Sequence, residues 1–150
     1  MGIAIDLIRD VWYPAWDSGD PERFERVCRE IFHPEATLRP PGVHVTEGTF
    51  EEVLPRWLVE LERWKPQVHE ITHVVDGGDH CAWEYMWHAT HAQGFTFGGK
   101  EIPATGRVFW NNAVALCYTR DGKIVHLRGA SNFHDIIREL EGHELTPIFS

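Results

Sequence analysis

The stretch PATGRVFWNNAVALCYTRDGKIVHLRGASNFHDIIRELEG, residues 103–142, decides the fold. Its pattern is that of a strand, a tight turn, a second strand and a closing helix. Asp121-Gly122 is a strong signal for a two-residue hairpin loop, because both residue types tolerate a positive φ. The sequence therefore predicts an antiparallel hairpin that leads into a C-terminal helix.

The register of this hairpin sets which side chains share a face. With Asp121-Gly122 as the loop, counting outward along both strands places Asn111 opposite Asn132. Because side chains alternate along a strand, one face then carries small and polar residues. They are Asn111, Ala113, Ala115, Cys117, His126, Arg128, Ala130 and Asn132. Small residues leave room, and the polar residues gather at one end of the face. We therefore expect this face to form the floor of a ligand pocket.

Length and composition predict one folded domain that spans residues 1–150. A chain of this size can bury about 68–70% of its unfolded surface. Hydrophobic residues make up 43% of the chain, with seven Trp and eight Phe, which argues against disorder. The net charge of −9 argues against nucleic acid or an anionic membrane as a partner.

The cysteines and the N-terminus favour a cytoplasmic protein. Cys28, Cys81 and Cys117 are widely spaced within apolar patterns, so we interpret them as reduced core cysteines. No apolar run approaches the length of a membrane span. Asp6 and Asp10 interrupt the first 16 residues, which a signal peptide would not allow.

Apolar periodicity predicts three helices ahead of a sheet. The expected helices are 3–17, 21–32 and 49–64, and the expected strands before the hairpin are 36–39, 68–76 and 81–91. Pro14 should kink or end the first helix near Trp12, and Asp20 and Thr49 are good N-caps for the next two. The Gly- and Phe-rich segment 94–99 is expected to be a loop.

This order of elements indicates an α+β fold. We expect three N-terminal helices packed on a curved, mostly antiparallel sheet, with a short C-terminal helix. A curved sheet wrapped by helices forms a cone-shaped α+β barrel, open at one end and lined by alternate strand residues.

Several short motifs point to a known family. They are FHPEATL (32–38), EGTFEEVL (47–54), THAQG (90–94), IPATG (102–106), DGKIVH (121–126) and NFHDIIRELEG (132–142). Together with the element order, they resemble the SnoaL-like polyketide cyclase branch of the nuclear transport factor 2-like, or ketosteroid isomerase-like, superfamily. The resemblance spans about residues 10–142.

The resemblance implies a chemistry and an assembly. Members of this branch close aromatic polyketides by an intramolecular aldol reaction, so neither an organic cofactor nor a metal is expected. Relatives with the same cone are isomerases, dehydratases, epoxide hydrolases and binding modules. These cones commonly pair through sheet faces, which implies a homodimer.

The sequence departs from the branch at its acid/base position. Asn132 stands where the family carries a carboxylate, and Arg128 and His126 replace its usual Trp and Glu. An Asn amide can donate or accept hydrogen bonds but cannot remove a proton. Two functions therefore stay open. One is a cofactor-free cyclase, isomerase, dehydratase or hydratase for an apolar cyclic or polyketide-like molecule, and the other is a non-catalytic binding module.

Asn132, His88 and Glu84 are the catalytic candidates. Asn132 would hold a substrate oxygen together with Asn111, unless it only caps the last helix. Glu84 and His88 share one strand face and would move the proton if that face lines the cavity. Otherwise they form a half-exposed polar stripe.

Asn111, Arg128, Trp57 and Trp12 are the ligand-binding candidates. Arg128 would balance charge inside the cavity or else lie on the surface. Trp12 and Trp57 lie on the apolar stripes of the first and third helices. The alternate Trp/Tyr/Trp face of strand 81–91 is core or a dimer interface. The ten His show no metal-binding spacing, and His44 would rim the cone mouth.

Overall fold

The computed structural model describes residues 2–41 and 47–143 and confirms the α+β fold. Its helices are α1 (Ile3–Asp6), the π-helix η1 (Leu7–Trp12), α2 (Tyr13–Asp17), α3 (Pro21–Ile31), α4 (Phe50–Arg63) and α5 (Phe133–Leu140). Its strands are β1 (Phe32–Arg39), β2 (Gly48–Thr49), β3 (Gln67–Asp76), β4 (His80–Thr90), β5 (Phe95–Phe97), β6 (Lys100–Ile102), β7 (Val108–Arg120) and β8 (Lys123–Ser131). His44, suggested above as a rim residue, lies outside the described residues.

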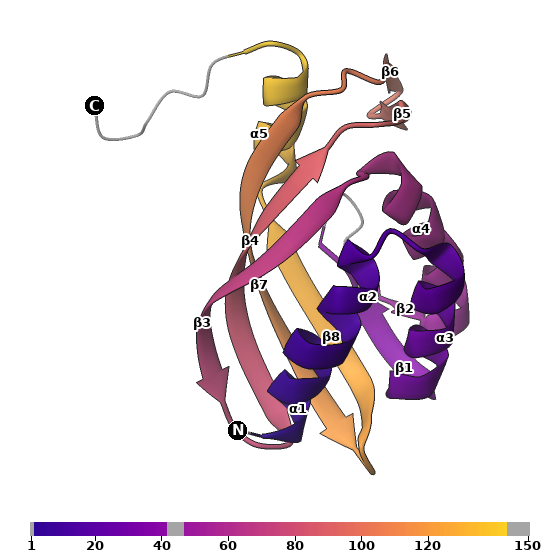
Figure 1. Ribbon diagram of the computed structural model, residues 1–150, viewed down its shortest axis with the longest axis vertical. Coiled ribbons are helices and arrows are strands. Elements are labelled where there is room, and N and C mark those ends of the chain that lie inside the picture. Colours follow the sequence, from indigo (N-terminus) through magenta and orange to yellow (C-terminus); the bar gives the residue numbers. More distant parts are fainter. Residues whose placement is uncertain (1, 42–46, 144–150) are drawn as a thin grey trace.

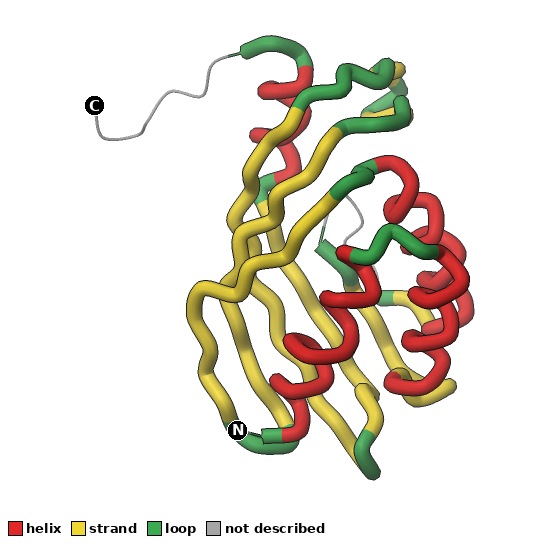
Figure 2. The backbone as a smooth tube through the Cα atoms, viewed as in Figure 1, coloured by secondary structure: helices red, strands yellow, loops and turns green. Residues whose placement is uncertain are grey.

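The six-stranded sheet has the order β2-β1-β8-β7-β4-β3, and only β1 and β8 pair in parallel among the described strands. Helices α1 to α4 lie on one side of this curved sheet (Figure 1). The strands wrap around them, and the β5–β6 hairpin and α5 stand at the far end (Figure 2). This is the cone that the element order predicted.

Residues 3–17 form one continuous helix, but its middle section, η1, is π-helical. The backbone N–H of Tyr13 bonds to the carbonyl of Ile8, five residues back. Pro14 has no N–H, and in an α-helix its ring would clash with the carbonyl four residues before it. The wider π turn accommodates that ring. Pro14 therefore changes the helix near Trp12 without ending it.

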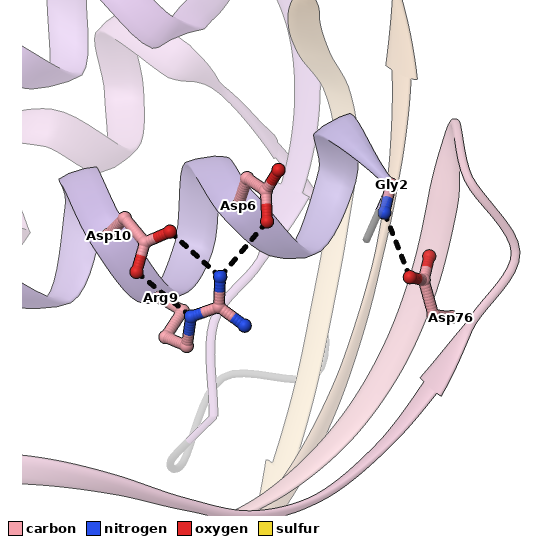
Figure 3. Close-up of polar contacts among 5 residues, drawn as sticks. All are labelled: Gly2, Asp6, Arg9, Asp10 and Asp76. Atoms are coloured by element: carbon pink, nitrogen blue, oxygen red, sulfur yellow. Dashed lines mark hydrogen bonds and ion pairs between the residues drawn. The ribbon is translucent and has the colours of Figure 1, made fainter.

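The start of this helix is held against the β3–β4 hairpin (Figure 3). The backbone N–H of Gly2 donates to Oδ2 of Asp76 at 2.8 Å. Further along, Nη2 of Arg9 lies 3.0 Å from Oδ1 of Asp6 and 2.8 Å from Oδ2 of Asp10. Ion pairs as exposed as these contribute little to stability. The Gly2 contact, together with the bond from the backbone N–H of Ala4 to the carbonyl of Gly78 at 3.1 Å, fixes the position of the helix start.

Both predicted N-caps form. The Asp20 side chain accepts from the backbone N–H groups of Glu22 and Arg23, and the Thr49 side chain accepts from that of Glu52. The second and third helices therefore begin where the sequence placed them. Each cap of this kind stabilises a protein by about 1 kcal/mol.

The predicted hairpin turn is correct, but the predicted register beyond it is wrong. Arg120 pairs with Lys123, and Asp121 and Gly122 have φ of 52° and 77°. Past Thr119 the pairing shifts by one residue, so that Tyr118 lies opposite His126. The residue skipped in this β-bulge is Val125.

The bulge reverses the expected faces of β8. Ala113 now pairs with Ser131, and Cys117 with Leu127. The face that carries Asn111 and the small residues of β7 therefore carries Leu127, Gly129 and Ser131. His126, Arg128 and Ala130 point to the opposite side. The physical reason is that Ile124 and Leu127, three residues apart, are both buried, and only an extra residue between them permits this.

The segment expected to be a loop at 94–99 forms part of a second hairpin. Phe97 pairs with Lys100, and the loop between them is Gly98-Gly99 with φ of 57° and 78°. Two positive φ values are typical of a type I′ turn, for which Gly-Gly is a known signal. Among the described strands, this hairpin forms no ladder with the large sheet.

Most buried apolar side chains lie between the helices and the sheet. A smaller apolar cluster at the far end includes Trp64, Ile102, Phe109 and Ile136. Over the described residues, no helix is long and apolar enough to cross a membrane.

Gly129 of β8 lies close against the chain that leaves β1. A Cβ atom added at Gly129 would lie 2.6 Å from Cδ of Pro41. We predict that Gly129→Ala lowers the free energy of unfolding by about 1–3 kcal/mol, since the ring must shift. Ala130→Ser, next along the strand on the exposed face, should change it by less than about 0.5 kcal/mol. Urea unfolding measures both, and equal stabilities would contradict the close approach.

Candidate functional site

A cavity of about 490 Å³ lies between the helices and the concave face of the sheet. Six of the seven tryptophans line it, namely Trp12, Trp16, Trp57, Trp64, Trp83 and Trp87. The volume is within the usual range for sites that bind small molecules, and walls rich in aromatic side chains with convergent polar groups are typical of such sites. The cavity is therefore the candidate functional site.

One wall residue, His69, is paired with an aspartate behind the wall, Asp17. Asp17 ends α2, and His69 lies near the start of β3. Nδ1 of His69 is 2.8 Å from Oδ1 of Asp17, and the backbone N–H of His69 donates to Oδ2 at 3.2 Å. The His69 side chain is only 10% exposed, and the Tyr13 ring stacks on it at 4.3 Å with an angle of 12°.

This arrangement fixes the tautomer of His69. A carboxylate beside Nδ1 keeps the proton on that nitrogen, so Nε2 is left as an acceptor in the neutral ring. Nε2 has no hydrogen-bond partner within the part of the chain that the structure describes. It is therefore the nitrogen that is available to a molecule in the cavity.

Two tyrosines lie beside the pair. Nε1 of Trp83 donates to the Tyr13 hydroxyl at 2.8 Å, and the Tyr85 ring lies 5.7 Å from that of His69. Burial raises the pKa of Tyr85 to about 12, although its contact with the Tyr13 hydroxyl lowers it somewhat. Burial also raises the pKa of Tyr13 well above 10.0. Both phenols keep their protons at neutral pH, so Tyr85 can donate a hydrogen bond to a ligand oxygen.

Three of the expected site residues line the cavity: Asn111, Trp57 and Trp12. Asn111 is 9% exposed, and its Nδ2 donates to the carbonyl of Asn132 at 3.3 Å. The two tryptophan rings are tilted against each other at 5.3 Å.

The other four expected site residues lie outside the cavity wall: Asn132, Arg128, Glu84 and His88. Asn132 is the N-cap of α5, because its Oδ1 accepts from the backbone N–H of Asp135 at 3.3 Å. Arg128 lies on the outer face because of the bulge, and its Nε donates to Glu47 at 2.8 Å. The pocket-floor placement expected for these two is therefore wrong.

Glu84 and His88 lie on the outer face of β4, opposite the Trp/Tyr/Trp face that lines the cavity. Glu84 bonds to Thr72 and His73 at 3.0 Å, and these bonds, that of Thr72 foremost, lower its pKa. His88 lies 3.4 Å from Glu70. They form the half-exposed polar stripe that the sequence left open.

Sequence reasoning missed the Asp17–His69 pair. In the sequence, His69 is one of ten histidines without metal-binding spacing, and Asp17 is only the last residue of the first expected helix. The alternation in β3 carried a usable signal, since Gln67 and His69 fall on the inward face there. No sequence signal pointed to Asp17 as the partner of His69, because the two residues are 52 positions apart.

The cavity contains other acidic and basic side chains at its rim, including Glu47, Glu52 and Arg56. Among the described residues, no group of three or more His, Cys, Asp or Glu side chains is placed to hold a metal ion.

Comparison with known proteins places the chain in a family. The family described as SnoaL-like domain matches residues 10–127. A comparison with curated proteins found no match.

Solved structures share the fold over nearly the whole chain. IdmH from Streptomyces antibioticus, described as a proposed polyketide cyclase, is 26% identical, with a TM-score of 0.72, over 91% of this chain and 97% of its own. AclR from Streptomyces galilaeus, a proposed hydroxylase, is 17% identical, with a TM-score of 0.74, over 96% of this chain and 84% of its own. A protein from Catenulispora acidiphila with a ketosteroid isomerase-like fold is 16% identical, with a TM-score of 0.67, over 96% and 99%.

The buried phenols predict a loss of stability in alkali. The unfolded chain releases these protons near pH 10, while the folded chain retains that of Tyr85 to about pH 12. The free energy of unfolding is thus unaffected below pH 10 and falls above it, by about 1 kcal/mol per pH unit for each phenol. We predict a shallower fall for Tyr85→Phe, measured by urea unfolding between pH 9 and 11.5. Parallel curves for the two proteins would mean that Tyr85 is not buried.

Proposed function

Because the chain belongs to the SnoaL-like domain family, we propose that its cavity binds an apolar small molecule and that the Asp17–His69 pair moves a proton on that molecule. The family is one of small-molecule enzymes. The observation that carries the proposal is the pair itself, held in an aromatic cavity with Nε2 of His69 unbonded.

Three side chains have separate roles in the proposed proton transfer: His69, Asp17 and Tyr85. Nε2 of His69 takes a proton from a carbon next to a ligand carbonyl, and the electrons of that C–H bond form an enolate. Asp17 holds the ring in place and stabilises the imidazolium that results. The Tyr85 hydroxyl donates a hydrogen bond to the enolate oxygen, where the negative charge develops. The enolate then attacks an internal carbonyl, whose oxygen takes the proton from the His69 imidazolium. Alternatively it takes that proton back at another carbon, or it expels a β-hydroxyl group, which takes the proton and leaves as water.

Cyclisation, isomerisation and dehydration share this first step, so the proposal covers a cofactor-free enzyme of any of these classes. The acid/base role that the family gives to a carboxylate near the last helix falls here to His69, since Asn132 cannot serve. The polar walls suit a carbonyl-bearing ligand, and the aromatic walls suit a ring.

The rival function is a binding module that uses the same cavity without chemistry. The replacement of the family carboxylate by Asn132 favours it. A buried Asp–His pair also occurs as a purely structural contact. The two functions differ in one measurable property, the acceleration of proton transfer.

Exchange of an acidic C–H proton in D₂O tests the proposal, with 2-tetralone as the probe ketone and NMR as the readout. We predict that the protein accelerates exchange and that His69→Gln removes about 10²-fold or more of the acceleration. Asp17→Asn should also slow the exchange, since the ring loses its fixed tautomer.

His88→Gln and Asn132→Ala are the matched controls, and both should retain the full rate. A loss of rate in His88→Gln would restore the outer-face residues Glu84 and His88 as the proton-transfer groups. Binding of 2-tetralone without any accelerated exchange would favour the binding module.

We further propose that a second copy of the chain covers the outer face of the sheet. Apolar side chains there are well exposed: Val68 is 51%, Val108 65%, Trp110 63%, Val114 52% and Tyr118 48% exposed. Exposed apolar side chains gathered on one sheet face usually mark an interface, and most of these lie on β7, beside the polar stripe of Glu84 and His88 on β4. The free buried cysteines support the cytoplasm as the place where the protein works.

Light scattering tests the assembly. We predict a mass of twice the chain's 17.3 kDa, and a single-chain mass for Trp110→Asp, which places a charge in the apolar face. Val59→Asp, on α4 away from this face, should leave the mass unchanged. A single-chain mass for the unaltered protein would contradict the pairing.

A further inference from the structure

Two amide side chains in the cavity wall have one end bonded and the other end without a partner. Gln67 and Asn111 both line the cavity and are 5% and 9% exposed. Neither takes part in the proton transfer proposed above. We call them the amide pair.

The orientation of the Gln67 amide is fixed by an indole. Oε1 of Gln67 accepts from Nε1 of Trp87 at 2.9 Å. The reversed amide would place two N–H groups against each other, so Nε2 must point away from the indole. Nε2 is buried and has no hydrogen-bond partner among residues 2–41 and 47–143. It is a donor that lacks an acceptor.

The Asn111 amide is oriented in the same way but with the opposite polarity. Its Nδ2 donates to the carbonyl of Asn132 at 3.3 Å, so its Oδ1 points elsewhere. Oδ1 is buried and without a partner in the described part of the chain. It is an acceptor that lacks a donor.

The two amides flank one aromatic side chain. Asn111 lies directly opposite Trp87 in the β7–β4 ladder, and Gln67 lies on β3 at the other side of β4. Two strand spacings, about 10 Å, separate β3 from β7. The amides therefore approach the cavity from both sides of Trp87, and the free donor and the free acceptor do not satisfy each other.

We propose that the amide pair recognises a neutral hydroxyl-bearing edge of the ligand, whose oxygen accepts from Nε2 of Gln67 and whose proton goes to Oδ1 of Asn111. A single hydroxyl supplies both where the two free atoms converge on one oxygen, and a hydroxyl beside a carbonyl supplies both across a wider gap. The edge must be neutral, because two amides provide no charge to balance an ion. This inference rests on the proposed use of the cavity for ligand binding, but not on the proton transfer.

The selectivity should be strong because both free atoms are buried and shielded from bulk solvent, so that nothing but a ligand group would replace their missing bonds. A site built to bond a hydroxyl leaves buried polar atoms unpaired when an analogue without that group enters, and it rejects such analogues far more than an apolar pocket rejects a missing methylene. The alternative is that the two amides form a hydrogen bond with each other in solution. They would then show no preference for a hydroxyl.

Three flat probes separate these cases: 2-naphthol donates and accepts, 2-methoxynaphthalene only accepts, and naphthalene does neither. We expect the unaltered protein to bind 2-naphthol at least 10-fold more tightly than naphthalene, with 2-methoxynaphthalene between them. Ligand-observed NMR measures the three affinities. Equal affinities, or no binding of any probe, would overturn the proposal.

Near-isosteric apolar variants test whether the amide pair causes the preference for 2-naphthol over naphthalene. In Asn111→Leu and Gln67→Met the ratio between 2-naphthol and naphthalene should fall to within about twofold, while naphthalene binds as before. Each change removes one bond and one unpaired atom but leaves the former partner, the Trp87 indole N–H or the Asn132 carbonyl, without its bond. Melting temperatures should therefore fall by no more than about 10 °C. Variants that keep the full preference would contradict the assignment.

Two further measurements test the hydroxyl preference in other ways. One needs no variant of the amide pair, and the other separates ligand binding from proton transfer. The side-chain ¹⁵N–H signals of Gln67 should shift with 2-naphthol and not with naphthalene, and the absence of a shift would count against the pair. Asp17→Asn should keep the hydroxyl preference while it loses proton exchange. Loss of exchange with the preference intact separates a failure of the proton-transfer proposal from a failure of this one.

Discussion

One residue in β8 decides which side chains of the central hairpin face the cavity. Side chains alternate along a strand, so the bulge at Val125 moves every residue beyond it to the other face. Leu127 thereby enters the core, and Gly129 lies where Pro41 crosses the strand. Arg128 is moved outward to Glu47 by the same shift. A charge that would have needed a partner inside the cavity is paired at the surface instead.

In the first helix, too, one extra residue decides which side chains face the cavity. An extra residue in a helix rotates everything after it by about 100° around the axis. The π turn ahead of Tyr13 therefore brings both Tyr13 and Asp17 round to the sheet side, where Ile5 and Ile8 already lie. Without it, Asp17 would point away from β3. The proline that demands the wider turn thus also places the carboxylate within 2.8 Å of His69.

Local chemistry explains what the sequence could predict. The caps at Asp20 and Thr49 and the turn at Asp121-Gly122 depend on residues close in sequence, and all three form. Trp12 and Trp57 were expected at the cavity because apolar helix stripes face a sheet. The bulge could not be predicted from the sequence, because it follows from the simultaneous burial of Ile124 and Leu127. The Asp–His contact could not be read either, since it joins a helix end to a strand that only the tertiary fold brings together.

The polar groups of the cavity share one physical feature. His69 has Nδ1 bonded and Nε2 unbonded, Gln67 has its oxygen bonded, and Asn111 has its nitrogen bonded. A buried polar group with no partner at all would be too costly to keep and free to rotate. A group bonded at one end keeps part of its hydrogen bonding and holds the other end in a fixed direction. The cavity therefore presents oriented donors and acceptors before any ligand arrives, which lowers the entropic cost of binding one.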